Sequence, residues 1–136
     1  MSKRLQFLFL FSIPLFTLHG MEEIYSGFYT IDSHVEFVFG WLEPTISLQT
    51  SFLIFQLVFW ISLVLSYFFL LKTRWSLWLA VFVGLIFIYE LHHAYKALVI
   101  GAYYPGLLTA FFLYILGFFY WKALIQWYIQ GNKFRR

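Results

Sequence analysis

Four long apolar segments fill most of this sequence, and they limit its fold more strictly than any other feature. A helix needs about 20 mostly apolar residues to cross the roughly 30 Å hydrocarbon core of a bilayer. The segments run over residues 5–25, 46–71, 75–100 and 105–129. The connections between them are too short for a separate soluble domain. We therefore expect a single all-α transmembrane domain over residues 1–136, built as a four-helix bundle.

The composition excludes an ordinary soluble protein. Only 11% of the residues are charged and 62% are hydrophobic, whereas about 25% of the residues of a typical soluble domain are charged. The 19 phenylalanines, ten tyrosines and six tryptophans suit a lipid-facing surface with aromatic anchors at its edges. The chain has no cysteine, which excludes thiol catalysis, thiolate metal ligands and disulfides.

Basic residues mark alternate ends of the segments and predict the orientation in the membrane. They are Lys3 and Arg4, Lys72 and Arg74, and Lys133, Arg135 and Arg136. Residues 25–45 contain no lysine or arginine. By the positive-inside rule, we expect a multi-pass protein of the cytoplasmic or plasma membrane with both termini in the cytoplasm. The net charge of +3 comes mainly from these flanks, so the expected partner is the lipid bilayer and not a nucleic acid.

The uninterrupted apolar part of the first segment is too short to span a bilayer alone. Residues 5–18 rise about 21 Å as a helix, so a spanning helix carries His19, Glu22 and Glu23 to the apolar layer. These positions are related as i, i+3 and i+4 and share one face. Ionisable groups at membrane depth cost about 2.5–3.5 kcal/mol each and usually mark a functional site. A secretory signal peptide cut next to Gly20 is the alternative, but the two residues before it are not small.

The third segment carries a second polar pair at the same depth. Glu90 and His93 are three residues apart and share a helix face. His19 lies 15 residues after Arg4. Glu90 lies 16 residues after Arg74. Both are therefore roughly 22–24 Å above the inner boundary. Because the first and third spans run in the same direction, we expect the two groups to meet in one cluster near the outer edge of the bilayer.

Other polar residues could surround this cluster. Gln49 and Gln56 lie two turns apart on one face of the second segment, and Thr109 lies one turn into the fourth. His34 and His92 are expected in the membrane interface rather than in the site. The aromatic-rich connection 24–45 is expected as an outer interfacial or re-entrant loop, which either covers a site or has no part in it.

Imidazole and carboxylate groups without a thiolate suit zinc, iron or manganese. The candidate metal ligands are His19, Glu22, Glu23, Glu90 and His93. His19, Glu22, Glu23 and His93 are also the candidate catalytic acids and bases. Without a metal, three close carboxylates could not all stay ionised. One would hold a proton and could act as a general acid beside a neighbouring base.

Two motifs resemble those of the HXXEE-domain family of small membrane proteins. The first is His19-x-x-Glu22-Glu23, followed by Gly27-Phe28. The second follows His93 at the family's usual distance, and is similar to its Tyr-x-Pro-Gly-x-x-Thr-Ala signature: Tyr103-x-Pro105-Gly106-x-x-Thr109-Ala110. The resemblance covers most of the chain and implies a membrane protein, suggested to be an enzyme, whose function is not established. Glu90 has no place in this pattern, so its pairing with His93 follows from helical spacing alone.

These features favour a membrane-embedded enzyme, metal-dependent or not, that acts on a lipid or other apolar substrate at the outer leaflet. One alternative is a metal-free acid–base isomerase, loosely similar in layout to emopamil-binding-type four-helix isomerases. Another is a transporter or accessory subunit, whose polar cluster passes protons or only holds helices together. The inner half of the spans has almost no polar path, which favours a site over a conduit.

Overall fold

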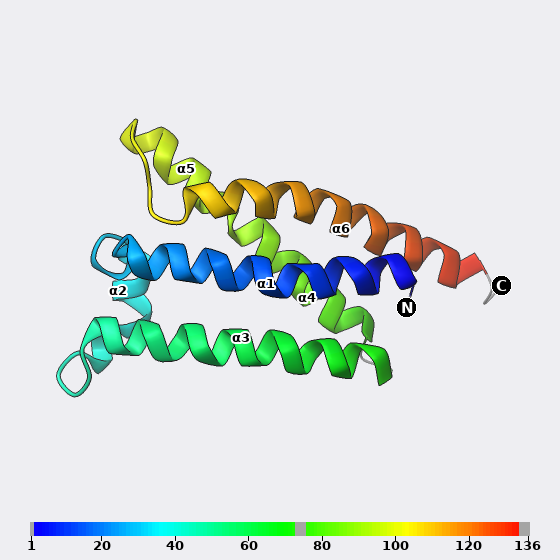
Figure 1. Cartoon of the computed structure of the whole chain (residues 1–136), viewed down its shortest axis with the longest axis horizontal. Coiled ribbons are helices and arrows are strands. Elements are labelled where there is room, and N and C mark those ends of the chain that lie inside the picture. The colour runs from blue at the N-terminus through cyan, green and yellow to red at the C-terminus, as the bar shows by residue number, and fades with distance from the viewer. Residues whose placement is uncertain (1, 73–75, 134–136) are drawn as a thin grey trace.

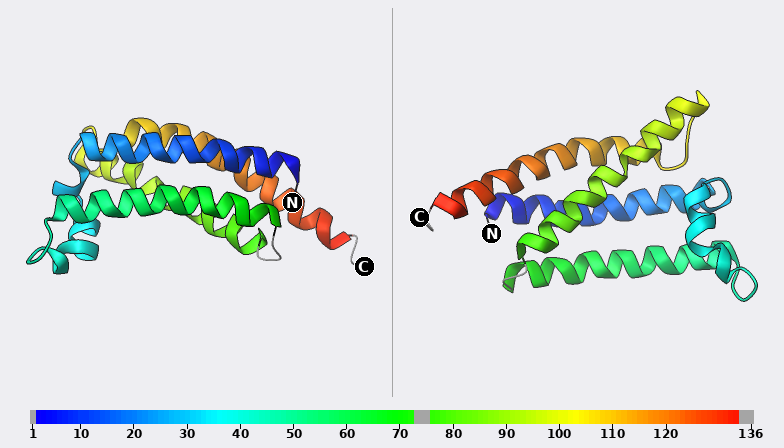
Figure 2. Two further views of the ribbon diagram at one scale, coloured as in Figure 1. Left: turned by 60° about the horizontal axis from the view of Figure 1, so that its bottom comes forward. Right: turned by 180° about the vertical axis from the view of Figure 1, so that it is seen from behind.

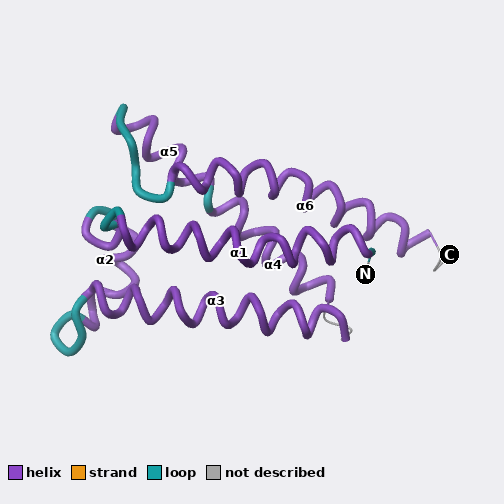
Figure 3. Tube along the Cα trace, in the orientation of Figure 1, coloured by secondary structure: helices purple, strands orange, loops and turns teal. Residues whose placement is uncertain are grey.

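The computed structural model describes residues 2–72 and 76–133, which form helices, turns and loops without a strand (Figure 3). The helices are α1 (Lys3–Tyr25), α2 (Ser33–Phe39), α3 (Leu48–Lys72), α4 (Ser76–Tyr89), α5 (Leu91–Ile100) and α6 (Leu107–Lys133). Two single-turn 3₁₀ helices, η1 (Phe28–Thr30) and η2 (Gly40–Leu42), flank α2. Four stretches are long and apolar enough to cross a membrane: Lys3–Tyr25, Leu48–Phe69, Ser76–Ile100 and Leu107–Gln130. The expected all-α architecture with four membrane helices is confirmed.

The helix α1 lies at the centre of the bundle. In Figure 1 it runs between α6 and α3, while α4 and α5 cross behind it from the end of α3 toward the start of α6; Figure 2 shows the same crossing from behind. The core includes Phe9 and Phe16 of α1 and Leu113 and Tyr120 of α6. Because lipid tails are as apolar as these side chains, close packing rather than exclusion from water holds the helices together.

The helices α4 and α6 approach closely at a pair of small residues. The hydroxyl of Tyr120 donates to the carbonyl oxygen of Ala80 at 2.9 Å, and Nε1 of Trp121 donates to that of Gly84 at 2.9 Å. A Cβ atom on Gly84 would lie 2.9 Å from the Trp121 ring. These ring donors therefore reach the backbone of α4 only because Ala80 and Gly84 leave room for them.

The third span is not the single helix expected over residues 75–100, because it breaks at Glu90. The hydroxyl of Tyr114 inserts into the helical ladder at this point. It donates to the carbonyl oxygen of Glu90 at 2.9 Å and accepts from the amide of Ala94 at 3.2 Å. In a regular helix that amide would donate directly to that carbonyl. An inserted side chain is an established cause of helix kinks.

The helix α2 is anchored to the α5–α6 connection through Asp32. This buried carboxylate accepts hydrogen bonds from the hydroxyl of Tyr104 and, at 2.7 Å, from the backbone N–H of His34. Burial by itself would raise the pKa of Asp32, but the hydrogen bonds outweigh burial and lower it. Burial and the contact with Asp32 raise the pKa of Tyr104. At neutral pH Asp32 is therefore ionised and Tyr104 is a neutral donor, which holds α2 in place.

Candidate functional site

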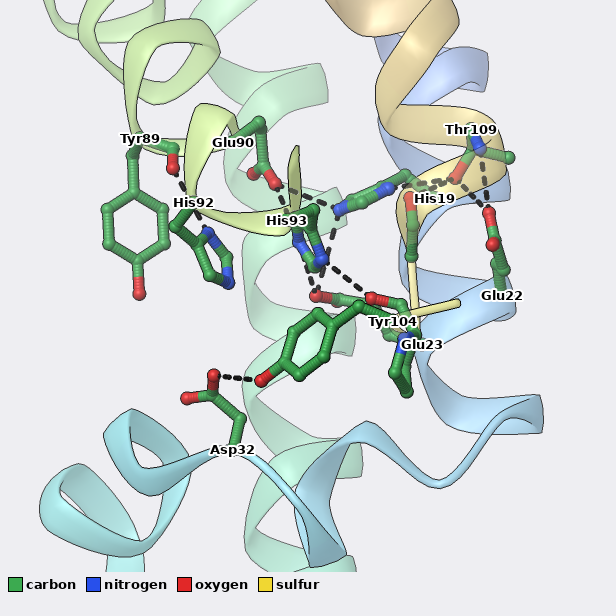
Figure 4. A network of polar contacts seen from close by, with 12 residues as sticks. His19, Glu22, Glu23, Asp32, Tyr89, Glu90, His92, His93, Tyr104 and Thr109 are labelled. Carbon is green, nitrogen blue, oxygen red and sulfur yellow. Dashed lines mark hydrogen bonds and ion pairs between the residues drawn. The ribbon is translucent and has the colours of Figure 1, made fainter. Parts of the chain in front are cut away.

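Two imidazoles meet between α1 and α5 near the end of the bundle that carries α2. The rings of His19 and His93 lie edge to face, with centroids 4.7 Å apart (Figure 4). Glu23, one turn after His19, and Glu90, at the break between α4 and α5, point toward them. All four side chains are buried. We call these four residues the His/Glu cluster.

The cluster is compact at the level of single atoms. Nε2 of His19 lies 2.9 Å from Oε2 of Glu90 and 3.7 Å from Oε1 of Glu23. Nε2 of His93 lies 3.2 Å and 3.4 Å from the same two oxygens. Despite these distances, neither Nε2 makes a hydrogen bond to any of the residues that the structure describes. Two buried nitrogens and two carboxylate oxygens thus surround one point at the distances of ion pairs.

The other nitrogen of each ring sets its orientation. Nδ1 of His93 lies 2.6 Å from the carbonyl oxygen of Pro105, which can only accept, so this nitrogen carries hydrogen. Nδ1 of His19 lies 2.8 Å from the hydroxyl of Thr109, and that hydroxyl donates to Glu22 at 2.5 Å. Thr109 must therefore accept from Nδ1 of His19. In their neutral forms, both imidazoles turn an Nε2 lone pair toward the carboxylates.

Glu22, a candidate ligand in the sequence, points toward α6 rather than into the cluster, and it caps the N-terminus of α6. Its carboxylate accepts from the backbone N–H groups of Leu108 at 3.1 Å and Thr109 at 2.8 Å, and from the hydroxyl of Tyr103 at 2.7 Å. The first N–H groups of a helix have no partner within the helix, and its dipole favours an anion there. Glu22 therefore contacts the cluster only through Thr109.

Gln56 reaches the cluster from α3. Its Nε2 donates to Oε2 of Glu23 at 2.7 Å, which leaves Oε1 of Glu23 facing the imidazoles. A Cβ atom at Gly20 of α1 would collide with the Gln56 amide oxygen, so glycine is needed for this contact. Gln49, seven residues earlier, is exposed at the start of α3. Of the two glutamines considered from the sequence, only Gln56 contacts the cluster.

The α5–α6 connection lies directly against both imidazoles. Gly106 has a φ of +86°, a backbone conformation that is strained for residues other than glycine. A Cβ atom there would lie 2.6 Å from Cε1 of His93 and 2.9 Å from Cε1 of His19. The Pro-Gly pair therefore supplies a carbonyl acceptor and a backbone surface without a side chain.

An apolar cavity of about 470 Å³ opens beside the cluster. His19, Glu23, Glu90 and Gln56 line one wall of it. Most of the remaining lining is apolar and comes from α1, α2, α3 and α4, including Phe16, Val35, Val38, Phe39, Phe52, Phe55, Phe59, Phe82, Leu85 and Ile86. His34, Tyr89 and His92 also line it. The outer connection 24–45 therefore contributes α2 to the cover of a cavity.

The sequence of the chain matches a known protein family over most of its length. The family model for proteins of unknown function with an HXXEE motif matches residues 10–121. This chain belongs to the HXXEE family. No curated protein and no solved structure matches it significantly.

In this HXXEE protein the two sequence motifs form one network. His19 pairs with Thr109, and Glu22 pairs with Tyr103 and Thr109, although about 80 residues or more separate the partners. The second motif also supplies the Pro105 carbonyl and the Gly106 backbone. Helical spacing correctly predicted that His19 and Glu23 act together, but it also placed Glu22 with them and contained no sign of the carbonyl contact.

Three further residues that support the site carried no recognisable signal in the sequence. Tyr114 creates the break that presents Glu90, while Asp32 and Tyr104 anchor α2 over the cavity. Each acts on a backbone group or side chain remote in the chain. Sequence spacing within one helix does not report such contacts.

Proposed function

We propose that this HXXEE protein is a metal-dependent enzyme of the membrane that hydrolyses a lipid or similarly apolar substrate at the outer leaflet. One observation carries the proposal: two buried Nε2 atoms without a hydrogen-bond partner among the described residues converge with two carboxylate oxygens on a single point. Lone pairs that converge in this way repel one another. A divalent cation at that point would stabilise all four groups.

The spacing of the four atoms suits zinc. Zinc binds histidine nitrogen and carboxylate oxygen at about 2.0–2.2 Å in a tetrahedron, which places neighbouring ligand atoms roughly 3.3–3.6 Å apart. The four nitrogen–oxygen distances in the cluster run from 2.9 to 3.7 Å. Iron and manganese accept the same donors. The His/Glu cluster therefore has both the donor types and the dimensions of a metal site.

The structure suggests different roles for the two carboxylates. Donor atoms of His19, Glu90 and His93 lie within 4.8 Å of one another, and these residues are the proposed ligands. Two histidines and one glutamate leave a fourth position for water in catalytic zinc sites. Glu23, which lies farther from both imidazoles than Glu90 and lines the cavity, is the proposed general base. Glu22 and Thr109 would orient His19 and raise its basicity as a ligand.

The proposed reaction is the hydrolysis of an ester or amide bond by one water molecule. Glu23 would take a proton from a water molecule at the cluster as the oxygen of that water forms a bond to the carbonyl carbon of the substrate. The bond from that carbon to the leaving oxygen or nitrogen then breaks, and Glu23 returns the proton to the leaving atom. The metal would lower the pKa of the water and polarise the carbonyl.

The same cluster also fits a metal-free enzyme. If Glu23 or Glu90 shared a proton with an imidazole, the pair could move protons on an apolar substrate in an isomerisation. The burial of both carboxylates favours such sharing. Metal content separates the two mechanisms, because only the hydrolase requires a bound ion.

Metal analysis of the purified protein tests the proposal directly. After chelation and reloading with zinc, we expect one equivalent of metal in the wild type and less than a tenth of that in His19→Ala and His93→Ala. His34→Ala is the matched control, because the His34 side chain is about half exposed and lies outside the cluster. Glu23→Gln should keep the metal and lose hydrolysis of a lipid ester in nanodiscs. Equal metal content in His19→Ala, His93→Ala and His34→Ala would contradict the proposed metal site.

A further inference from the structure

The cavity opens on the exposed apolar surface of the bundle. Three of its lining side chains, Phe55 of α3 and Phe82 and Leu85 of α4, also belong to the outer surface of the bundle, with 45%, 63% and 52% of their area exposed. Figure 2 shows that α4 and α5 diverge from α3 toward the end that carries α2, and these exposed lining residues come from α3 and α4. A ligand would therefore enter sideways from the apolar layer.

The volume of the cavity limits the number of chains that it can hold. Sites for drug-sized ligands measure about 300–1,000 Å³, and this cavity of about 470 Å³ lies in the lower half of that range. Its walls are almost entirely aromatic and aliphatic. These dimensions and this chemistry suit one hydrocarbon chain rather than both chains of a diacyl lipid.

The polar lining away from the cluster offers hydrogen-bond acceptors. Nδ1 of His92 lies 3.1 Å from the carbonyl oxygen of Tyr89, so this nitrogen carries hydrogen. Nε2 of His92 is then an acceptor, and it is buried without a partner among the described residues. His34 likewise directs Nδ1 to Asp32 at 3.1 Å and keeps Nε2 as an acceptor. A ligand that satisfies these nitrogens must bring O–H or N–H donors.

The charge around the cavity disfavours an anionic head group. None of its lining residues is lysine or arginine, whereas Glu23 and Glu90 line it and Asp32 lies behind His34. A phosphate or free carboxylate would meet these acids with no basic partner. The lining therefore favours a head group that has no negative charge and supplies donors such as hydroxyls; the experiment below separates a neutral hydroxyl from a cationic amine.

We propose that the cavity binds a single-chain lipid with an uncharged, hydroxyl-bearing head group, such as a monoacylglycerol, which enters from the bilayer between α3 and α4. This inference rests on the proposed function, since it names the substrate class of the same site. The chain would lie among the phenylalanines, and the head-group hydroxyls would donate to Nε2 of His92 and of His34. An ester next to such a head group would lie within the part of the cavity that the His/Glu cluster borders.

Photolabelling in nanodiscs of phosphatidylcholine tests the inference without turnover or metal. The probe is monooleoylglycerol with a photoreactive diazirine in its chain. We expect saturable labelling of peptides from α3 and α4 that line the cavity, at least ten times stronger than with oleic acid, oleylamine or a diacyl phosphatidylcholine carrying the same diazirine. Equal labelling by any of these lipids, or even labelling of all lipid-facing helices, would overturn the proposal.

Substitution at the mouth of the cavity provides the matched control. Leu85→Trp should block the opening and lower the labelling at least ten-fold. Leu57→Trp should leave it unchanged, because Leu57 is similarly exposed on α3 but does not line the cavity. His92→Phe should weaken labelling by monooleoylglycerol, since it removes the unpartnered Nε2 acceptor but keeps an aromatic ring at this position. Unchanged labelling in both Leu85→Trp and His92→Phe would overturn the inference.

The two proposals can fail separately. If the wild type binds no zinc but is labelled selectively by monooleoylglycerol, the metal-dependent reaction is wrong and the lipid site remains. If Leu85→Trp and the wild type bind zinc equally and neither is labelled selectively by monooleoylglycerol, the lipid inference alone is wrong.

Discussion

The hydroxyl of Thr109 lies between the two halves of the HXXEE motif. It donates to Glu22 at 2.5 Å and accepts from Nδ1 of His19 at 2.8 Å. Through this one atom, the carboxylate that caps α6 determines which nitrogen of His19 faces the cluster. Partners that orient a metal-binding histidine in this way usually affect metal affinity by 10–100-fold.

We predict that Thr109→Val weakens zinc binding about 10–100-fold, because Nδ1 of His19 loses its acceptor and the ring loses its fixed orientation. Thr109→Ser keeps the hydroxyl and should bind zinc nearly as the wild type does. Competition with a fluorescent chelator measures both affinities. The backbone N–H of Thr109 still donates to Glu22 in either variant, so α6 keeps its cap. Equal zinc affinities of Thr109→Val and Thr109→Ser would show that the hydroxyl does not position His19.

At the scale of single elements, the division of the third span into α4 and α5 determines where Glu90 points. The break needs the hydroxyl of Tyr114, which separates the carbonyl of Glu90 from the amide of Ala94. A continuous helix would rotate and shift the residues around this point. The position of Glu90 in the cluster thus depends on a side chain from α6.

We predict that Tyr114→Phe closes the break, because the amide of Ala94 can then donate directly to the carbonyl of Glu90. The Glu90 carboxylate should move away from His19, and zinc affinity should fall about ten-fold or more. Amide hydrogen exchange over residues 90–94 and chelator competition measure the two effects. Tyr128→Phe, on the exposed face of α6, is the control. If both variants matched the wild type, Tyr114 would have no positioning role.

At the scale of the whole molecule, the ends of the bundle differ in chemistry. The helix α1 begins and α6 ends at one end, whereas α2 and the cavity lie toward the other (Figure 1). The basic residues that begin α1, Lys3 and Arg4, are therefore far from the His/Glu cluster. This arrangement agrees with an even number of crossings and places the site toward one end of the bundle.

We predict that α2 faces the outside of the cell and that both termini lie in the cytoplasm. The cysteine-free chain allows a direct test with a membrane-impermeant maleimide. Thr45→Cys, at an exposed position between α2 and α3, should react in intact cells. A cysteine added after Arg136 should react only after the cells are opened. The reverse pattern would invert the orientation and place the site at the cytoplasmic leaflet.

The sequence by itself determined the number of spans and the level of the polar residues along them. The observed ends of the membrane helices lie within four residues of those expected. His19 and Glu90 meet at one level, as their distances from the basic residues before each span predicted. Both results follow from apolar length and the helical rise per residue, which depend on local sequence only.

Only the tertiary structure decided which partner each side chain meets. Glu22 and Glu23 are adjacent and equally acidic, but they point about 100° apart on α1. The placement of α6 and α5 around α1 sends Glu22 to the N-terminus of α6 and Glu23 to the imidazoles. The break at Glu90 and the cavity likewise arise from how helices cross. Helical periodicity specifies directions within one helix, whereas contacts depend on the relative positions of several helices.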